Sequence, residues 1–328
     1  MAFLHFQDGG LHAISVAPGQ TVVEAAIEAD APLRFDCMTG ACGSCIARRT
    51  AGVVRLDRSD APIVSADENA AGIYPTCLTR LESDASFMLD YPFAPAPSAP
   101  GRHAAHVVSI DRLASNVSRV VLNLTDSAGF VFQPGQYVRL RPPGLRVARA
   151  YSIASAPADL PRLELLIRHV PGGQVSGWLD GSATIGDRIA LHGPLGGFAL
   201  DDRGAKAVFV AGGTGLAPAL SMIRAHAGRM QMLLCFGCTR REELFLEDEL
   251  RALAVAHPML EIRIALMEGA SGATRHGTAV ALLAGDSHDD ARYHLCGPPG
   301  MVDAARVALR MAGVETDHVR AERFTIGG

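Results

Sequence analysis

The spacing of apolar positions changes along the chain, and its middle part has the pattern of short strands. From His103 to about Asp202, brief apolar runs are separated by turn residues such as Pro134-Gly135 and Pro171-Gly172-Gly173. The strand-like runs are Val117–Leu124, Gln136–Leu140, Leu163–Arg168 and Arg188–His192. Short strands at such spacing predict an antiparallel barrel or sandwich.

Beyond Ala205 the pattern alternates between buried strands and helices. The strands are expected at Ala207–Ala211, Gln231–Phe236, Leu260–Leu266 and Tyr293–Cys296. Helix-like segments lie between or after them, at Ala217–Ala227, Glu242–Ala256 and Met301–Met311. Strands that alternate with helices predict βαβ units around a parallel sheet.

A proline-rich stretch separates the first third of the chain from the strand-rich middle. Phe93–Gly101 has no hydrophobic periodicity, and its prolines favour an extended spacer over a packed element. Residues 1–92 hold 12 Asp or Glu and 6 Arg without any Lys, a net charge of −6, against −4 for the whole chain. We therefore expect a first domain at 1–92, a linker at 93–102, a second domain at 103–203 and a third at 204–328.

Composition restricts the classes of protein to be considered. A chain with 48% hydrophobic and 20% charged residues folds as a globular protein, and a net charge of −4 gives no general attraction to nucleic acid. The N-terminus lacks the features of a signal peptide, and the uncharged stretch Ala207–Ile223 is shorter than the roughly 20 residues that span a membrane. We expect a cytoplasmic protein without membrane association, in which seven cysteines favour metal binding or catalysis over disulfides.

Four cysteines carry the strongest chemical signal. Cys37, Cys42 and Cys45 follow the spacing C-x4-C-x2-C, and Cys77 comes after 31 further residues. Three close thiolates can wrap one face of a [2Fe–2S] cluster, and a distant fourth completes the site of the second iron. Zinc ribbons prefer paired C-x2-C knuckles, which this spacing lacks. The pattern predicts a [2Fe–2S] cluster, and residues 1–92 resemble plant-type ferredoxins, which implies a β-grasp fold.

Two further motifs lie in the strand-rich middle. In Arg149-Ala150-Tyr151-Ser152, the Arg offers a planar fork for a pyrophosphate, and the Tyr shares its face of a strand and can stack on an aromatic ring. For this tetrapeptide alone, an ordinary strand with a surface Arg and a half-buried Tyr is the better explanation. Gly172-Gly173-Gln174-Val175-Ser176 then opens a predicted helix whose free N–H groups would form an anion site.

Two glycine motifs follow strands of the last stretch. Gly212-Gly213-Thr214-Gly215 comes after one buried strand, and Cys296-Gly297-Pro298-Pro299 after the last expected one. Glycines let backbone N–H groups approach a pyrophosphate, and ligands of open α/β sheets bind beyond the carboxyl ends of strands. The first motif is not the G-x-G-x-x-G fingerprint, so without the second motif a tight strand–helix turn would explain it as well.

Together these motifs resemble the ferredoxin–NADP⁺ reductase superfamily. The resemblance implies an antiparallel Greek-key β-barrel that binds FAD, followed by a parallel-sheet α/β domain that binds NAD(P). It implies that Tyr151 and Ser152 contact the isoalloxazine and that Arg149 contacts the pyrophosphate. The other residues implied to bind cofactors are Gly173, Val175 and Ser176 at the FAD pyrophosphate, Gly212, Gly213, Thr214 and Gly215 at the nicotinamide nucleotide, and Cys296, Gly297 and Pro298 beside its nicotinamide.

Residues near the C-terminus and two further cysteines complete the candidates. In relatives an aromatic residue near the C-terminus covers the flavin ring, which makes Phe324 a candidate, with Glu322 as a second; a packed terminal Phe is expected as often. Cys296 is interpreted as adjacent to the nicotinamide and not as a nucleophile, because no histidine base is implied. Cys235 and Cys238 have the spacing of a redox pair, but we interpret them as small buried residues at a strand end.

Ferredoxin, FAD and NAD modules in one chain make a complete electron path from NADH through FAD to the [2Fe–2S] cluster. Their order resembles the single-chain reductase components of bacterial Rieske aromatic-ring-hydroxylating dioxygenases of the benzoate, anthranilate, toluate and naphthalene type. This implies that the partner is a separate oxygenase or its small ferredoxin, reached through the acidic first domain, and that the donor is NADH. Arg240 and Arg241 offer cations for a 2′-phosphate, which leaves NADPH open.

Two kinds of alternative stay open at this point. The same architecture serves the reductase components of di-iron monooxygenases (phenol, methane or alkene type) and of deoxysugar dehydrases. A non-catalytic iron–sulfur binding or sensor protein is a more distant alternative, which the flavin and nucleotide motifs oppose.

Overall fold

The computed structural model describes residues 2–7, 11–29, 31–35, 38, 40, 45–57, 64, 66–89, 100–146, 148–286 and 288–324. It divides into two compact units, of which the first ends at Pro97 and the second runs from Ser98 to Phe324. Of the expected linker at 93–102, residues 93–99 lie outside the described residues. Its last two residues already belong to strand β8, which begins at Gly101.

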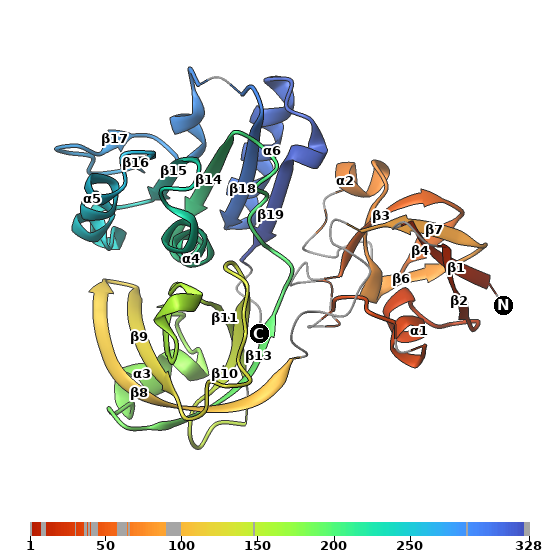
Figure 1. Cartoon of the computed structure of the whole chain (residues 1–328), viewed down its shortest axis with the longest axis horizontal. Helices are drawn as coiled ribbons and strands as arrows, with labels where there is room; N and C mark the ends of the chain where they lie inside the picture. Colours follow the sequence, from red (N-terminus) through yellow and green to blue (C-terminus); the bar gives the residue numbers. More distant parts are fainter. Residues whose placement is uncertain are drawn as a thin grey trace. The chain divides into compact units, whose positions relative to one another are not determined.

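The first unit is built on a small mixed sheet (Figure 1). Within its described residues, five strands are ordered β2-β1-β7-β3-β5, and β1 and β7 run parallel. The strands are β1 Ala2–Gln7, β2 Leu11–Val16, β3 Ile46–Ala51, β5 Ile73–Pro75 and β7 Ala85–Met88. Strands β4 Val54–Leu56 and β6 Thr79–Leu81 form a separate ribbon, and a short helix α2 spans Ala66–Ala70. This is the expected β-grasp fold.

Helix α1, Val22–Glu28, shows how the sequence specifies this unit locally. The Thr21 side chain accepts a hydrogen bond from the backbone N–H of Glu24 at 3.2 Å, and the Glu24 carboxylate accepts one from the Thr21 N–H at 2.8 Å. This reciprocal capping satisfies donors that a helix start would otherwise leave unpaired. The apolar positions of the helix then pack into a core with Leu4, Phe6 and Phe87.

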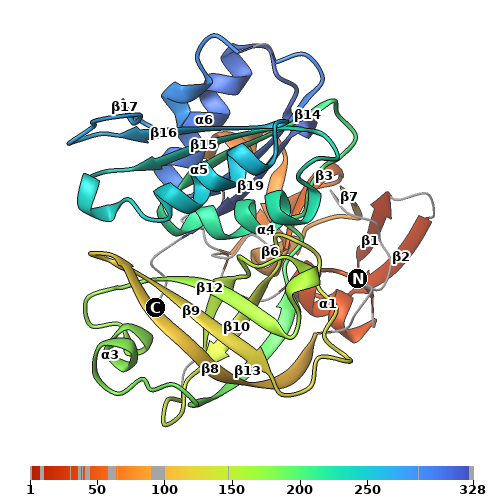
Figure 2. The ribbon, with the colours of Figure 1, turned by 60° about the vertical axis from the view of Figure 1, so that its left-hand side comes forward.

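The second unit begins with an antiparallel barrel (Figure 2). Its six described strands are ordered β11-β10-β13-β8-β9-β12, and an isolated bridge between Ile153 and Leu165 joins the two ends. The strands are β8 Gly101–Ala114, β9 Val117–Leu124, β10 Tyr137–Arg141, β11 Arg149–Ser152, β12 Arg162–Arg168 and β13 Arg188–Leu195. Helix α3, Gln174–Gly181, lies between β12 and β13 in the chain. Alternate residues fill the interior, so the barrel is a packed core.

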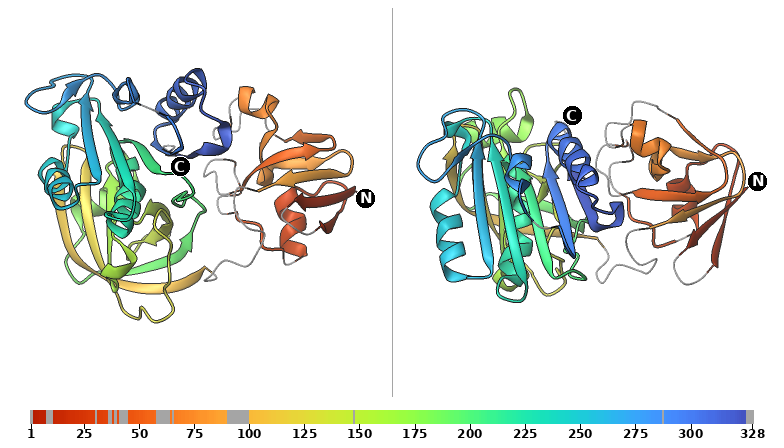
Figure 3. Two further views of the ribbon diagram at one scale, coloured as in Figure 1. Left: turned by 45° about the horizontal axis from the view of Figure 1, so that its top comes forward. Right: turned by 90° about the horizontal axis from the view of Figure 1, so that it is seen from above.

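The second unit continues as a doubly wound α/β fold. Its described strands form one parallel sheet in the order β17-β16-β15-β14-β18-β19. They are β14 Lys206–Gly212, β15 Gln231–Cys238, β16 Leu260–Leu266, β17 Arg275–His276, β18 Ala291–Gly297 and β19 Val319–Arg323. Helices α4 Leu216–His226 and α5 Glu247–Ala256 cover one face, and α6 Pro299–Met311 covers the other (Figure 3).

The direction of winding reverses between β14 and β18, which are neighbours in the sheet. In doubly wound sheets this switch point, at the carboxyl ends of the strands, is where ligands bind. Both glycine motifs of the sequence lie there, because one follows β14 and the other ends β18.

One expected helix begins later than predicted. The segment Glu242–Ala256 starts as a short 3-10 turn, Arg241–Glu243, and the helix itself begins only at Glu247. Phe245 and Leu246 are buried between the two, and Leu246 has a φ of +57°, which no α-helix accommodates. Among the described residues, no helix is both long and apolar enough to cross a membrane.

Candidate redox site

Two of the four predicted cluster ligands are brought together by strand pairing. Ile46, at the start of β3, pairs with Pro75, at the end of β5, so the residues just outside this pair are also neighbours. The carbonyl of Cys45 accepts hydrogen bonds from the N–H of Thr76 at 3.0 Å and from its hydroxyl at 2.6 Å. Cys77 follows in the same 3-10 turn, and both cysteines are buried in one hydrophobic cluster.

The other two predicted ligands, Cys37 and Cys42, lie outside the described residues. The described parts of their loop bend sharply, since Met38 and Gly40 have φ values of +57° and +72°. Left-handed residues curl a chain into a tight loop. Cys45 and Cys77, which are buried in one cluster next to paired strand ends, fit two ligands of a small sulfur-ligated cluster.

The flavin motif forms strand β11, and its register places each side chain. Ser152 pairs with Tyr137 of β10 and is buried, whereas Arg149 and Tyr151 lie on the other face and are half-buried. Burial raises the pKa of the Tyr151 phenol, partly countered by the nearby Arg149 cation. Tyr151 is therefore an uncharged, partly exposed ring beside a cation. This pair suits a ligand whose aromatic ring can stack on the Tyr and whose phosphate can bind the Arg.

The expected phosphate loop, which precedes α3, forms a cradle of backbone N–H groups. Gly173 precedes α3 without any side-chain cap, so the first N–H groups of the helix are available to an anion. A Cβ on Gly173 would lie 3.0 Å from the Val170 carbonyl and 3.2 Å from Ser176 Oγ. A pocket of 620 Å³ opens here, lined by this loop and by Ser115 and Asn116. The buried Oδ1 atom of Asn116 has no hydrogen-bond partner among the described residues.

The three residues of this cradle that are predicted to contact the pyrophosphate differ in which atoms they can offer. Val175 is 3% exposed and packs in the barrel core, so only its backbone N–H can serve a ligand. The Ser176 hydroxyl already accepts a hydrogen bond from the Val170 N–H at 2.8 Å. Gly173 keeps the approach open. The loop thus offers backbone donors, as a pyrophosphate requires.

The two glycine motifs of the α/β domain pack directly against each other. A Cβ on Gly215 would lie 2.1 Å from the Cys296 carbonyl oxygen, and one on Gly297 would lie 3.1 Å from the Gly212 nitrogen. Glycine is therefore required for packing at 215 and 297, and also at 212, where a Cβ would lie 2.7 Å from Met301 Sδ. Gly213, with a φ of +53° and no neighbour within 4 Å of its Cβ position, and the half-buried Thr214 face the open side. The exposed Pro298 begins α6 on that side as well.

Residues from the barrel and from the parallel sheet converge at one carboxylate. Cys296 on β18 pairs with Glu322 on β19, and its thiol donates to Glu322 Oε2 over 3.9 Å. The side chain of Ser152, from barrel strand β11, is near enough to this carboxylate to lower its pKa. Burial raises the pKa of Glu322 to about 8, an effect that Cys296 and Ser152 only partly offset. Burial and the Glu322 charge raise the pKa of the Cys296 thiol far above its usual range.

This convergence can do specific chemistry near neutral pH. Glu322 can hold or release a proton beside the flavin strand, because a group titrating near the working pH is suited to proton transfer. Cys296 stays a thiol and so is a packing group and not a nucleophile. Phe324 is half-buried, packs against the cluster that contains Cys296, and its N–H donates to the Gly297 carbonyl at 2.8 Å.

The sequence did not indicate that the turn between β8 and β9 contributes to the phosphate pocket. Ser115 and Asn116 line the phosphate pocket, and Asn116 Nδ2 donates to Glu243 of the α/β domain at 3.3 Å. No sequence motif identifies this turn, because only the closure of the barrel brings it to the pocket.

Cys235 and Cys238 do not form a facing pair. Three residues apart on strand β15, they point to opposite faces of the sheet. Burial raises the pKa of each thiol to about 12. Cys235 is buried, as interpreted, whereas Cys238 is half-buried.

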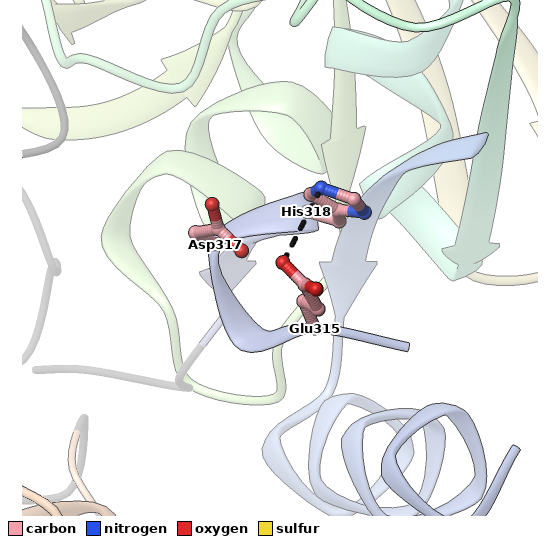
Figure 4. A group of neighbouring side chains, drawn as sticks. All are labelled: Glu315, Asp317 and His318. Carbon is pink, nitrogen blue, oxygen red and sulfur yellow. Dashed lines mark ion pairs between the residues drawn. The ribbon is translucent and has the colours of Figure 1, made fainter. Parts of the chain in front are cut away.

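A group of metal-ligand types also occurs before β19 (Figure 4). The ligand atoms of Glu315, Asp317 and His318 lie within 4.8 Å of one another. Both carboxylates are exposed, and Glu315 lies 3.9 Å from His318 Nε2. A surface ion pair at a turn accounts for the arrangement.

Comparisons with known families match this geometry in three parts. Residues 6–82 match the 2Fe-2S iron-sulfur cluster binding domain, 104–200 the oxidoreductase FAD-binding domain and 209–307 the oxidoreductase NAD-binding domain.

Whole-chain relatives extend the match. The chain is 38% identical over 269 residues, 78% of each chain, to methane monooxygenase component C of Methylosinus trichosporium. It is 30% identical to the toluate 1,2-dioxygenase electron transfer component of Pseudomonas putida, over 97% of this chain and 96% of that one. Its fold matches the Amycolatopsis cytochrome P450 reductase GcoB with a TM-score of 0.74 at 29% identity, covering 99% of both chains.

Proposed function

The chain belongs to the iron–sulfur flavoprotein reductases that are electron transfer components of bacterial oxygenases, and on that premise we propose that it carries electrons from NADH through FAD and a [2Fe–2S] cluster to a separate oxygenase. The observation that carries this proposal is the convergence of Ser152, Cys296 and Glu322. It brings the flavin strand of the barrel and the nucleotide end of the parallel sheet to one point.

The side chains at this point have separate tasks. Bound FAD supplies the chemistry of accepting a hydride, as two electrons, and releasing them one at a time to the cluster. Tyr151 would support the flavin ring as an uncharged aromatic. Cys296, kept as a thiol, would contact the nicotinamide, and Phe324 would cover the flavin ring. Glu322, with Ser152 beside it, would hold a proton near the reaction point.

The phosphates of the two nucleotides have separate sites in this scheme. Arg149 and the N–H groups after Gly173, including those of Val175 and Ser176, bind the FAD pyrophosphate. For the nicotinamide nucleotide, the binding residues are Gly212, Gly213, Thr214, Gly215, Gly297 and Pro298. The [2Fe–2S] ligands are Cys37, Cys42, Cys45 and Cys77, and the protein acts in the cytoplasm.

NADH is favoured over NADPH by ion pairs after strand β15. Arg240 Nε lies 3.3 Å from Glu268 Oε2, and Arg241 lies 2.9 Å from Glu247 Oε2. Both cations that could meet a 2′-phosphate are therefore partnered, and a phosphate there would also face the Glu268 charge.

Changing Glu268→Gln tests this preference. Without the carboxylate, Arg240 can pair with a 2′-phosphate, and kcat/KM for NADPH should rise about tenfold, equivalent to about 1.4 kcal/mol, while that for NADH is kept. Glu261→Gln, which removes a similarly exposed carboxylate that pairs with Arg263 at the other end of β16, is the control. Equal NADPH kinetics in both variants would refute this role of Glu268.

The electron acceptor we propose is a Rieske aromatic-ring-hydroxylating oxygenase or its small ferredoxin, as for the toluate relative. A di-iron monooxygenase is the second candidate, favoured by the 38% identity to methane monooxygenase component C. Mixing the purified reductase with each class of oxygenase and measuring NADH-dependent product formation decides between them.

Replacing Cys42 with Ser tests the path as a whole. Loss of the cluster should abolish electron transfer to the oxygenase, while NADH-dependent reduction of ferricyanide by the flavin stays within about twofold of wild type, because hydride transfer needs only the FAD and NAD domains. Both activities are followed spectrophotometrically in FAD-loaded protein. If the folded, FAD-loaded variant no longer reduces ferricyanide, the modular path is wrong.

A further inference from the structure

A chain of three polar side chains lies at the phosphate pocket, where His169 and Asp180 belong to the lining and Ser118 does not. Ser118 Oγ is 2.8 Å from His169 Nε2, and His169 Nδ1 is 3.2 Å from Asp180 Oδ1 and 3.3 Å from Oδ2. A carboxylate only accepts hydrogen bonds, so Nδ1 carries the proton, and in the neutral ring Nε2 accepts the Ser118 hydroxyl. Both ring nitrogens are thus engaged.

The order Ser–His–Asp is that of a hydrolytic triad, but access excludes that role. Ser118 is only 3% exposed, lies within strand β9, and is not among the residues that line the pocket. A serine nucleophile must meet its substrate in the open. The three residues therefore act as a structural link.

The link joins three elements at one imidazole. His169 is the first residue after β12, Ser118 belongs to the neighbouring strand β9, and Asp180 lies in the last turn of α3. The His169 N–H also donates to the Asn116 carbonyl at 2.8 Å. One ring thus fixes the start of the loop to the barrel and the far end of the helix to the same place.

What lies between these fixed ends is the phosphate cradle. The Val170 N–H donates to Ser176 Oγ at 2.8 Å and the Gly173 N–H to the Val170 carbonyl at 2.9 Å, so the loop is bonded to the first turn of α3. Hydrogen bonds at both ends thus oppose rotation of the helix relative to the barrel and favour one direction of its N–H groups. Donors fixed before a ligand arrives cost less to order on binding.

We propose that His169, bridging Ser118 and Asp180, is the positioning residue that preorganises the phosphate loop for the FAD pyrophosphate. This rests on the proposed function, in which that loop binds FAD. The ring contributes no contact to the hydride-transfer point formed by Ser152, Cys296 and Glu322. Its loss should weaken FAD binding and leave the chemistry of the loaded enzyme intact.

The experiment measures FAD affinity of the full chain by titrating FAD into protein stripped of flavin, with flavin fluorescence as the readout. His169→Leu removes both links and should raise the Kd for FAD about tenfold or more, the equivalent of about 1.4 kcal/mol. His169→Asn, whose amide can stand in for Nδ1 toward Asp180, should restore part of the affinity. With saturating FAD, kcat and KM for NADH should stay within about twofold of wild type.

Three further variants keep the test decisive if His169→Leu folds poorly. Asp180→Asn changes a half-exposed carboxylate, so the fold should be retained, and Kd should rise severalfold because a neutral amide holds the ring less firmly. The substitution also removes the ion pair of Asp180 with Arg112 Nη2 at 3.3 Å, and Arg112→Met, which removes that ion pair alone, should leave the Kd unchanged. Asp126→Asn is the matched control for Asp180→Asn, an exposed carboxylate that accepts only the Ala128 N–H at 2.9 Å in its own loop. Far-ultraviolet circular dichroism and thermal melting of the full chain check that the barrel of each variant is folded.

The outcomes separate the two proposals. A wild-type Kd in folded His169→Leu or Asp180→Asn would overturn the positioning role while leaving the proposed function untouched. Failure of wild-type protein to bind FAD at all would overturn the proposed function. A raised Kd that Asn at position 169 does not improve, with kcat also lost at saturating FAD, would show a general disruption and also overturn the positioning role.

Discussion

The surroundings of Glu322 change the acidity of its carboxyl group. It is an acid held among a thiol, a hydroxyl and apolar neighbours, and its pKa is raised to about 8. The raised value makes a proton available at the pH of the cell, which an ordinary surface glutamate would not offer. The same shift affects stability.

An acid whose pKa is higher in the folded than in the unfolded state holds its proton more firmly when folded. Its contribution to stability is therefore present at low pH and is lost as pH rises from about 4.5 to about 8. Glu322→Gln, which cannot ionise, should lose less stability between pH 6 and 9 than wild type. Thermal melts across this range measure the effect, and parallel pH profiles for the two proteins would contradict it.

At the scale of single residues, the sequence names candidate ligands but not the contacts between residues. The spacing of Cys45 and Cys77 predicts that they belong to one site, and strand pairing brings Cys45 next to Thr76, the neighbour of Cys77. The contact of Ser152 with Glu322 could not be predicted, because 169 residues of chain separate them and only the packing of barrel against sheet brings them together. Glu322 could be named only from its place near the C-terminus.

Among the elements, those with strong hydrophobic patterns were predicted best. Val117–Leu124 and Leu260–Leu266 are strands with the predicted bounds. Strand β19, Val319–Arg323, was not predicted, because its sequence Val-Arg-Ala-Glu-Arg is largely polar and it lies at the edge of the sheet. Yet it carries Glu322, so an important element had the weakest pattern.

The close contact of the two glycine motifs gives a prediction for an element boundary. In Gly215→Ala, the Cβ would lie 2.1 Å from the Cys296 carbonyl, so the end of β18 or the start of α4 must move. We expect a loss of stability of about 1–3 kcal/mol and at least tenfold lower kcat/KM for NADH, measured by urea unfolding and steady-state kinetics.

Gly181→Ala is the control for that substitution, since it is also helical and has no atom within 4 Å of its Cβ position. It should be neutral or slightly stabilising. If Gly215→Ala behaves like Gly181→Ala, the motifs do not pack as closely as the structure indicates.

On the scale of the whole second unit, hydrogen bonds tie the barrel to the parallel sheet. From helix α4, Arg224 donates to the Ala154 carbonyl at 3.0 Å and lies 3.1 Å from Glu164 Oε2, and Ser221 donates to the Ser155 carbonyl at 2.7 Å. These bonds follow directly after the flavin strand. They hold Ser152 where Glu322 can reach it.

Arg224→Met should therefore slow hydride transfer more than it weakens binding. It keeps the apolar length of the side chain but removes both polar contacts with the barrel. We expect the rate of flavin reduction by NADH in stopped flow to fall about tenfold, as small misplacements at a reaction centre do, with FAD content unchanged. Arg229→Met, on the exposed turn after α4, is the control, and equal rates in both variants would disprove the idea.

The division of the chain at Pro97 has a consequence for how such proteins diversify. Ser152, Cys296, Glu322 and the phosphate loop all lie between Ser98 and Phe324. In the proposed function, the residues that take up electrons are thus encoded apart from those that deliver them. On that basis we expect that exchanging the first 97 residues for those of a relative changes the acceptor and leaves the donor chemistry unchanged.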